Sequence, residues 1–144
     1  MKLRLDWQFG AALLVAPIVW IILLFILPTT FDFLWPLYSL NHFLMLVISY
    51  PILEEIAFRG CLQSILFSDA FGRKKLAGIS FANVITSLIF TGFHFFYHPI
   101  LWASLVFFPS LILGYFRDKY DTIEHAIILH IFYNGGYYWI FRIG

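Results

Sequence analysis

Five long apolar runs, separated by short connectors, are the feature that most constrains the fold of this chain. They cover about residues 9–27, 40–68, 77–97, 99–116 and 123–141. A helix that crosses the hydrocarbon core of a bilayer needs about 20 apolar residues. Helices and closed barrels alone satisfy their backbone hydrogen bonds in lipid, and barrel strands are short and alternate in polarity. The pattern therefore predicts an all-α, polytopic membrane helical bundle with about five transmembrane segments.

The composition agrees with a chain that is surrounded by lipid. Hydrophobic residues make up 62% of the 144 positions and charged residues 12%, whereas soluble domains carry about 25% charged residues. The formal net charge of +1 leaves no basic surface for phosphates, which excludes nucleic acid as a partner. The single cysteine, Cys61, excludes a disulfide framework within the chain. The length predicts one integral membrane domain over residues 1–144.

Basic residues predict the orientation of the helices. Three basic groups lie near the ends of the apolar runs: Lys2 with Arg4, residues 73–75, and Arg117 with Lys119. No small-residue cleavage site follows the first run, so we expect a retained helix rather than a signal peptide. If each run crosses once, the three groups share one side, and that side should be cytoplasmic. We therefore predict a cytoplasmic N-terminus in a prokaryotic inner membrane, with Arg142 outside and charged loops at 68–75 and 117–122.

Several ionisable and amide side chains nevertheless fall within the apolar runs: Glu54, Glu55, Arg59, His94, His98, Glu124, His125, His130 and Asn134. A charge near the bilayer centre costs roughly 2.5–3.5 kcal/mol on insertion scales. A lone histidine or asparagine is often an interhelical hydrogen-bonding group, but this set exceeds what packing requires. Glu124 and His125 begin the last run, where a carboxylate is an ordinary helix cap, and His98 precedes a break at Pro99. The remaining side chains predict a functional site.

Spacing determines which of these side chains can meet. Glu55 and Arg59 are four residues apart and can form an ion pair on one helical face. Glu54 is rotated by about 100° from Glu55, so this spacing leaves it without a local cation. His130 and Asn134 also share a face. Three clusters result, one in each of three runs: the Glu54, Glu55 and Arg59 group, His94, and the His130 and Asn134 pair. At about 1.5 Å of rise per residue, they reach a similar depth in the membrane. We therefore expect them to line one cavity nearer the non-cytoplasmic side.

This pattern resembles the three motifs of the CAAX protease and bacteriocin-processing family, also called Abi or type II CAAX prenyl endopeptidases. These proteins are glutamic intramembrane proteases. The matching residues lie within about 46–136: Glu54-Glu55-x-x-x-Arg59, Phe90-x-x-x-His94 and His130-x-x-x-Asn134, with Phe58, Gly60 and Gly92 beside them. Relatives often have seven or eight spans, so this chain is similar to their core.

The resemblance implies a hydrolase that cuts a peptide bond near the membrane-embedded or lipidated C-terminal tail of a protein. It implies that Glu54 is the general base that activates a water and that His94 helps to hold and polarise this water. His130 and Asn134 would form the oxyanion hole. No metal or other cofactor is required. The implied partners are a protein or peptide substrate with a membrane-associated tail and the lipid bilayer, and the oligomeric state is left open.

The same residues leave other interpretations open. Two histidines and two glutamates are possible zinc ligands, so a metal-dependent membrane protease is the main alternative. The chain lacks a His-Glu-x-x-His helix, and Arg59 would repel a cation from Glu55, its partner in the supporting pair that the resemblance implies. A non-catalytic bacteriocin-immunity or membrane partner protein is a further alternative. A small proton-coupled transporter is another, which the absence of an evident repeat disfavours.

Overall fold

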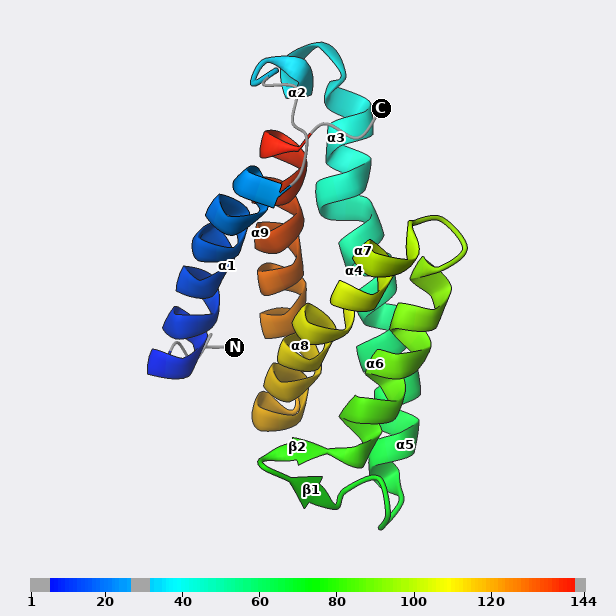
Figure 1. Ribbon diagram of the computed structural model, residues 1–144. Helices are drawn as coiled ribbons and strands as arrows, with labels where there is room; N and C mark the ends of the chain where they lie inside the picture. Colours follow the sequence, from blue (N-terminus) through cyan, green and yellow to red (C-terminus); the bar gives the residue numbers. More distant parts are fainter. Residues whose placement is uncertain (1–5, 27–31, 142–144) are drawn as a thin grey trace. The chain divides into compact units, whose positions relative to one another are not determined.

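The computed structural model describes residues 6–26 and 32–141 (Figure 1). About 79% of it is helical, which agrees with the predicted all-α class. Within these ranges, two helices are long and apolar enough to cross a bilayer, Trp7–Ile26 and Ile100–Tyr120, a test that some helices of soluble proteins also pass. The predicted five spans are therefore not confirmed. The orientation rested in part on Lys2, Arg4 and Arg142, which lie outside the described residues.

The third apolar run differs from its prediction at the start. Strands β1 (Lys75–Leu76) and β2 (Ile79–Ser80) form an antiparallel hairpin, and helix α6 begins only after it and spans Phe81–His94. Ala77 and Gly78, which connect the strands, both have positive φ. Positive φ at both central residues is typical of two-residue hairpin turns, because it matches the twist of the flanking strands. The helix is therefore only 14 residues long.

The fourth run continues beyond its predicted end. It forms α7 (Ile100–Leu105) and α8 (Phe107–Tyr120), so the prediction of a charged loop over 117–122 was wrong for residues 117–120. The physical reason is that charged side chains find partners at this helix end. The Arg117 guanidinium donates to Asp118 at 3.1 Å and to the Ser64 hydroxyl at 2.8 Å.

The second run is a series of helical stretches from Leu40 to Ser68. It comprises α3 (Leu40–Leu44), η1 (Met45–Ser49), α4 (Tyr50–Glu55), η2 (Ile56–Gln63) and α5 (Ser64–Ser68). The stretches η1 and η2 are π-helical, with hydrogen bonds over five residues instead of four. π-Helical turns are rare and occur frequently at functional sites. Here they flank the segment that carries Glu54 and Glu55.

The chain divides into two compact units, residues 1–53 with 128–144 and residues 54–127, and each is described by itself. In the first unit, α1 (Trp7–Ile26) packs on the C-terminal part of α9 (Glu124–Ile140). The Tyr133 hydroxyl donates to the Ala12 carbonyl at 3.0 Å. This contact ties two segments that are far apart in the sequence.

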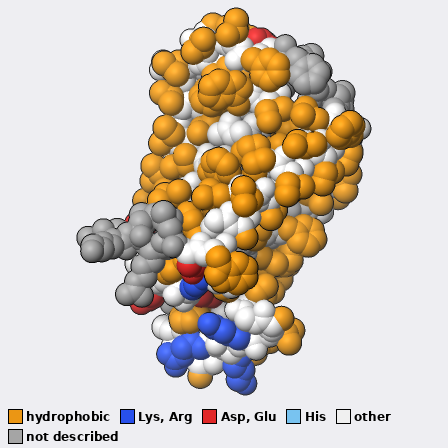
Figure 2. Space-filling model, turned by 90° about the vertical axis from the view of Figure 1, so that its left-hand side faces the viewer, with side chains coloured by type: hydrophobic (Ala, Val, Ile, Leu, Met, Phe, Trp, Pro, Cys, Tyr) orange, Lys and Arg blue, Asp and Glu red, His pale blue; other side chains and the backbone are white. Residues whose placement is uncertain are grey.

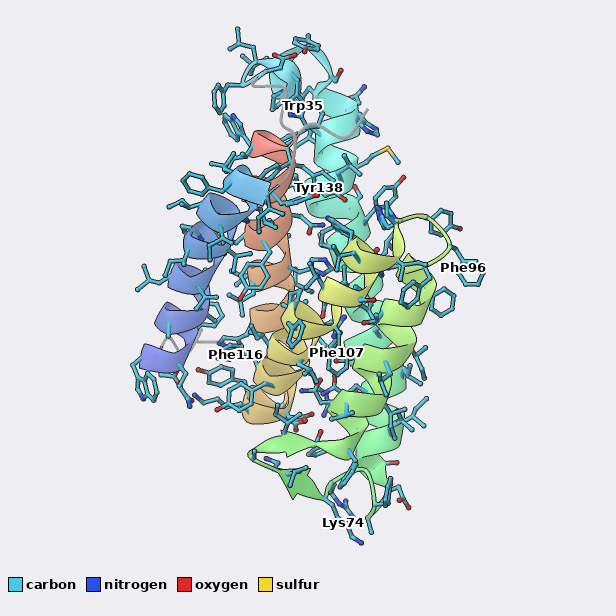
Figure 3. All side chains as sticks on the ribbon, in the orientation of Figure 1. Trp35, Lys74, Phe96, Phe107, Phe116 and Tyr138 are labelled. Atoms are coloured by element: carbon cyan, nitrogen blue, oxygen red, sulfur yellow. The ribbon has the colours of Figure 1, made fainter. Side chains whose placement is uncertain are left out.

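The short helix α2 (Trp35–Tyr38) is fixed to the end of α9 in the same unit. The Trp35 indole donates to the Tyr138 carbonyl at 2.9 Å, and both side chains are labelled in Figure 3. Trp35 is buried and also packs edge-on against Phe43. The connector between the first two apolar runs therefore contains a short helix.

In the second unit, η2, α6 and α8 pack on one another. The Asn83 amide of α6 donates to the Leu111 carbonyl of α8 at 2.9 Å. Gly114 of α8 permits this close packing, because a Cβ at that position would overlap the Asn83 side-chain oxygen. The three helices thus form a tightly packed framework, in which η2 carries Arg59 and α6 carries His94.

Much of the surface is apolar, as a lipid environment requires. Figure 2 shows hydrophobic side chains over most of one face, with lysine and arginine gathered at one end. Large side chains such as Phe25 are almost fully exposed, at 87%. The exposed basic residues Arg73, Lys74 and Lys75 belong to the β-hairpin and the loop before it. This distribution agrees with a protein that is embedded in a bilayer and whose second unit has a polar end at the β-hairpin.

Candidate active site

The predicted ion pair between Glu55 and Arg59 is present. Arg59 Nη1 lies 3.0 Å from Glu55 Oε1, and both side chains have no exposed surface. Removal of one partner from such a buried pair typically costs about 3–5 kcal/mol, because the other charge is left uncompensated in a medium of low dielectric constant. The pair is therefore an obligate unit of the structure, which fits the supporting role predicted for it.

Arg59 is also anchored by α8, which the sequence analysis did not anticipate. Its Nη2 donates to the Ser110 hydroxyl at 2.6 Å and to the Ser110 carbonyl at 3.1 Å. Ser110 is buried. Ser110 is 51 positions from Arg59 along the chain, and a hydroxyl within an apolar run gives no local signal of such a contact.

Glu54 is partly buried and lies one position before the pair. The Arg59 guanidinium interacts electrostatically with both carboxylates, more strongly with Glu55 than with Glu54. The interpretation that Glu54 has no local cation was therefore too simple. Glu55 accepts the direct hydrogen bond from Arg59, whereas Glu54 has the weaker electrostatic interaction with this guanidinium.

His94 ends α6 and is oriented by its own helix. Its Nδ1 lies 2.9 Å from the Phe90 carbonyl oxygen. A carbonyl can only accept, so this contact assigns the hydrogen to Nδ1 and makes Nε2 the acceptor nitrogen of the neutral ring. A hydrogen bond made by one ring nitrogen commonly sets the tautomer of a functional histidine. A water near Nε2 would donate a hydrogen to it.

Phe90 joins the ion pair to His94. The Arg59 guanidinium carbon lies 4.6 Å above the centre of the Phe90 ring. The centre of the His94 ring lies 4.6 Å from the centre of the Phe90 ring. Phe58, three positions after Glu55, packs edge-on against Phe90 with ring centres 4.9 Å apart. The structure thus brings together the first two predicted motifs in one unit, through an aromatic residue that belongs to the second motif.

Two further aromatic rings lie next to His94. The ring centres of Trp102 and His98 are 6.1 Å and 5.8 Å from that of His94. His98 and Trp102 are in turn 4.2 Å apart. The sequence analysis set His98 aside because it precedes the break at Pro99, and the structure places its ring beside that of His94. Figure 3 shows Phe96 at the outer side of the loop that follows α6.

His130 and Asn134 belong to the first unit and lie one turn apart on α9. His130 is buried. The Asn134 amide donates one hydrogen to the Leu46 carbonyl at 3.0 Å. An amide group carries two hydrogens, so this bond leaves a second donor on the same nitrogen.

A second buried polar cluster lies near the polar end of the second unit and was not predicted. The Asp118 carboxylate accepts hydrogen bonds from Gln63 at 2.8 Å, from Arg117 at 3.1 Å and from the Ser80 hydroxyl. Gln63 also donates to the Gly114 carbonyl at 2.9 Å. These bonds join η2, α8 and the start of α6. Because η2 also carries Arg59, the cluster helps to fix the helix that holds the ion pair.

No group of three or more histidine, cysteine, aspartate or glutamate side chains is arranged to hold a metal ion in the part of the chain that the structure describes. Cys61 is exposed on η2. Glu124 begins α9, and His125 stacks on Tyr120 with ring centres 3.9 Å apart. These residues lie apart from the contacts made by Arg59 and His94.

Fold and site together define an all-α protein with an apolar exterior, in which a buried carboxylate–guanidinium pair adjoins a histidine. The family model described as Type II CAAX prenyl endopeptidase Rce1-like matches residues 18–136. The chain therefore belongs to this family, as its motifs predicted, and the family is one of membrane-embedded proteases. No curated protein and no solved structure matches the chain.

Proposed function

We propose that this chain is an intramembrane endopeptidase in which Glu54 activates the attacking water. The observation that carries the proposal is the arrangement of the first two motifs. Arg59 makes its direct bond to Glu55 and interacts more weakly with Glu54. The same guanidinium packs on Phe90, whose carbonyl orients His94. A general base needs to accept a proton, and Glu54, which is not a member of the ion pair between Glu55 and Arg59, is better suited to this than Glu55.

The proposed reaction uses each group for one step. The water donates one hydrogen to Glu54 and one hydrogen bond to Nε2 of His94, and its oxygen attacks the carbonyl carbon of the peptide bond. Glu54 then returns the proton to the departing amine as the carbon–nitrogen bond breaks. His130 and Asn134 of the first unit donate to the oxygen that becomes negative. One such donor is typically worth about 10²–10³ in rate.

The proposed substrate is a protein with a membrane-associated C-terminal tail. Family membership supports a protein substrate and a membrane location. Prenylated CAAX tails, bacteriocin leader peptides and C-terminal sorting tags of exported proteins are the classes that the family resemblance offers. The predicted orientation places the site nearer the non-cytoplasmic side, which favours the tail of an exported protein.

Comparison of protein termini in cells tests this function. Membrane fractions from cells that express the wild type or Glu54→Gln would be compared by mass spectrometry for N-terminal and C-terminal peptides. We expect a set of new termini that depends on the wild-type protein and is absent with Glu54→Gln. Glu124→Gln, which removes a carboxylate at the start of α9, should produce the same termini as the wild type. Identical termini from Glu54→Gln and wild type would favour a non-catalytic membrane protein.

A further inference from the structure

Pro51 lies three positions before Glu54 and is buried. Proline has no backbone N–H, so it cannot donate to a carbonyl in the preceding turn. In the π-helical pattern of η1, a residue donates to the carbonyl five positions earlier. Accordingly, the Tyr50 N–H bonds to the Met45 carbonyl. The carbonyl five positions before Pro51 is that of Leu46, and neither Tyr50 nor Pro51 donates to it.

The Leu46 carbonyl instead accepts the Asn134 amide at 3.0 Å. A carbonyl left without a donor is costly in an apolar medium, so the bond satisfies a group that the proline leaves without its backbone partner. The helices are close at this point. A Cβ at Gly135 would lie only 3.5 Å from the Val47 side chain. All of these residues belong to the first unit, so the arrangement is independent of how the two units meet.

We infer that Pro51 is a positioning residue for Asn134. By removing one N–H, it leaves the Leu46 carbonyl to bind one amide hydrogen of Asn134, and this bond fixes the direction of the second hydrogen. The inference rests on the proposed function, in which that second hydrogen donates to the oxyanion. The missing backbone hydrogen bond at Pro51 thus frees a carbonyl that orients a side chain on another helix.

Two substitutions that differ in a single backbone group test the inference. Pro51→Ala introduces an N–H that can bond to the Leu46 carbonyl in place of Asn134. Replacement of Pro51 by lactic acid, the α-hydroxy analogue of alanine, gives the same side chain with an ester and no N–H. We expect the alanine variant to lower kcat by about 10-fold to 100-fold with KM unchanged, since loss of a whole oxyanion donor costs about 10²–10³. The lactic acid variant should retain most of the wild-type kcat.

A spectroscopic measurement gives the second result and does not depend on catalysis. Asn41, Asn83 and Asn134 are the asparagines of this chain, so protein labelled with ¹⁵N-asparagine shows three side-chain amides, and Asn134→Asp identifies one of them. In the wild type, one Asn134 amide hydrogen should exchange slowly, like those of Asn83, which also bonds to a carbonyl, and unlike those of the exposed Asn41. Pro51→Ala should remove this protection and the lactic acid variant should keep it.

The outcomes separate the inference from the function on which it rests. Equal effects of the alanine and lactic acid substitutions on kcat would overturn the inference, because the N–H would then be irrelevant. Rapid exchange of both Asn134 amide hydrogens in the wild type would overturn it even if the alanine variant failed to fold. Absence of any wild-type cleavage, with the predicted amide protection present, would refute the proposed function and leave the Pro51–Leu46–Asn134 arrangement supported.

Discussion

Asp118→Asn is expected to destabilise the protein strongly, and the neighbouring Asp121→Asn provides its control. The Asp118 side chain is 3% exposed and accepts three hydrogen bonds, from Gln63, Arg117 and Ser80. Asn has the same shape but no charge. Bonds to a charged group contribute about 1 kcal/mol more than bonds between neutral groups. Three such differences amount to about 3 kcal/mol of unfolding free energy.

Asp121 differs from Asp118 in its surroundings and not in its chemistry. Its side chain is 89% exposed and lies 3.9 Å from Arg117, so this ion pair should contribute about 0–1 kcal/mol. Asn also tolerates the left-handed conformation that Asp121 adopts. Chemical or thermal unfolding in detergent micelles, followed by tryptophan fluorescence, would compare the two variants. A difference below about 1 kcal/mol between them would refute the view that the Asp118 cluster fixes η2 to α8.

The other predictions concern the packing around the site and its pH dependence. Ser110→Ala removes the hydroxyl that holds Arg59 and should lower kcat by about 10-fold or more without raising KM, whereas Ser110→Thr should restore cleavage; equal rates for all three proteins would exclude a role for this hydroxyl. Gly114→Ala would place a methyl group against Asn83 and should lower the unfolding free energy by about 1–3 kcal/mol, as measured by denaturation in micelles; unchanged stability would contradict the tight α6–α8 contact. His98 lies in the connector between α6 and α7, and burial lowers its pKa. The unfolded chain therefore binds a proton at His98 more readily than the folded protein does. The folded protein should lose stability as the pH falls below about 6.5. His98→Asn should reduce that loss, and identical stability profiles against pH would contradict it.

The sequence predicted the parts of the structure that depend on local spacing. The Glu55–Arg59 pair follows from a separation of four residues, and it is present. Apolar runs predicted where most helices lie. The predicted roles of Glu54, His94, His130 and Asn134 remain proposals, because they depend on contacts between helices that local spacing does not determine.

What the sequence could not predict depends on partners that are distant along the chain. Ser110 is 51 positions from Arg59, and nothing in its own surroundings distinguishes it from a serine that only fills space. The π-helical stretches change the hydrogen-bond pattern without changing the apolar composition, so the sequence alone does not indicate which carbonyl Pro51 leaves without a donor. The hairpin before α6 is shorter than the windows in which hydrophobic periodicity can be recognised.

Cleavage by purified protein in lipid vesicles, after treatment with a chelator, tests the central claim most directly. The substrate would be a peptide that carries one of the termini identified in cells. We predict that the chelator-treated wild type continues to cut this peptide at its original rate and that Glu54→Gln, treated in the same way, does not cut it. Activity that disappears with the chelator and returns with zinc would contradict a water activated by Glu54 alone, and so would a Glu54→Gln protein that cleaves at the wild-type rate.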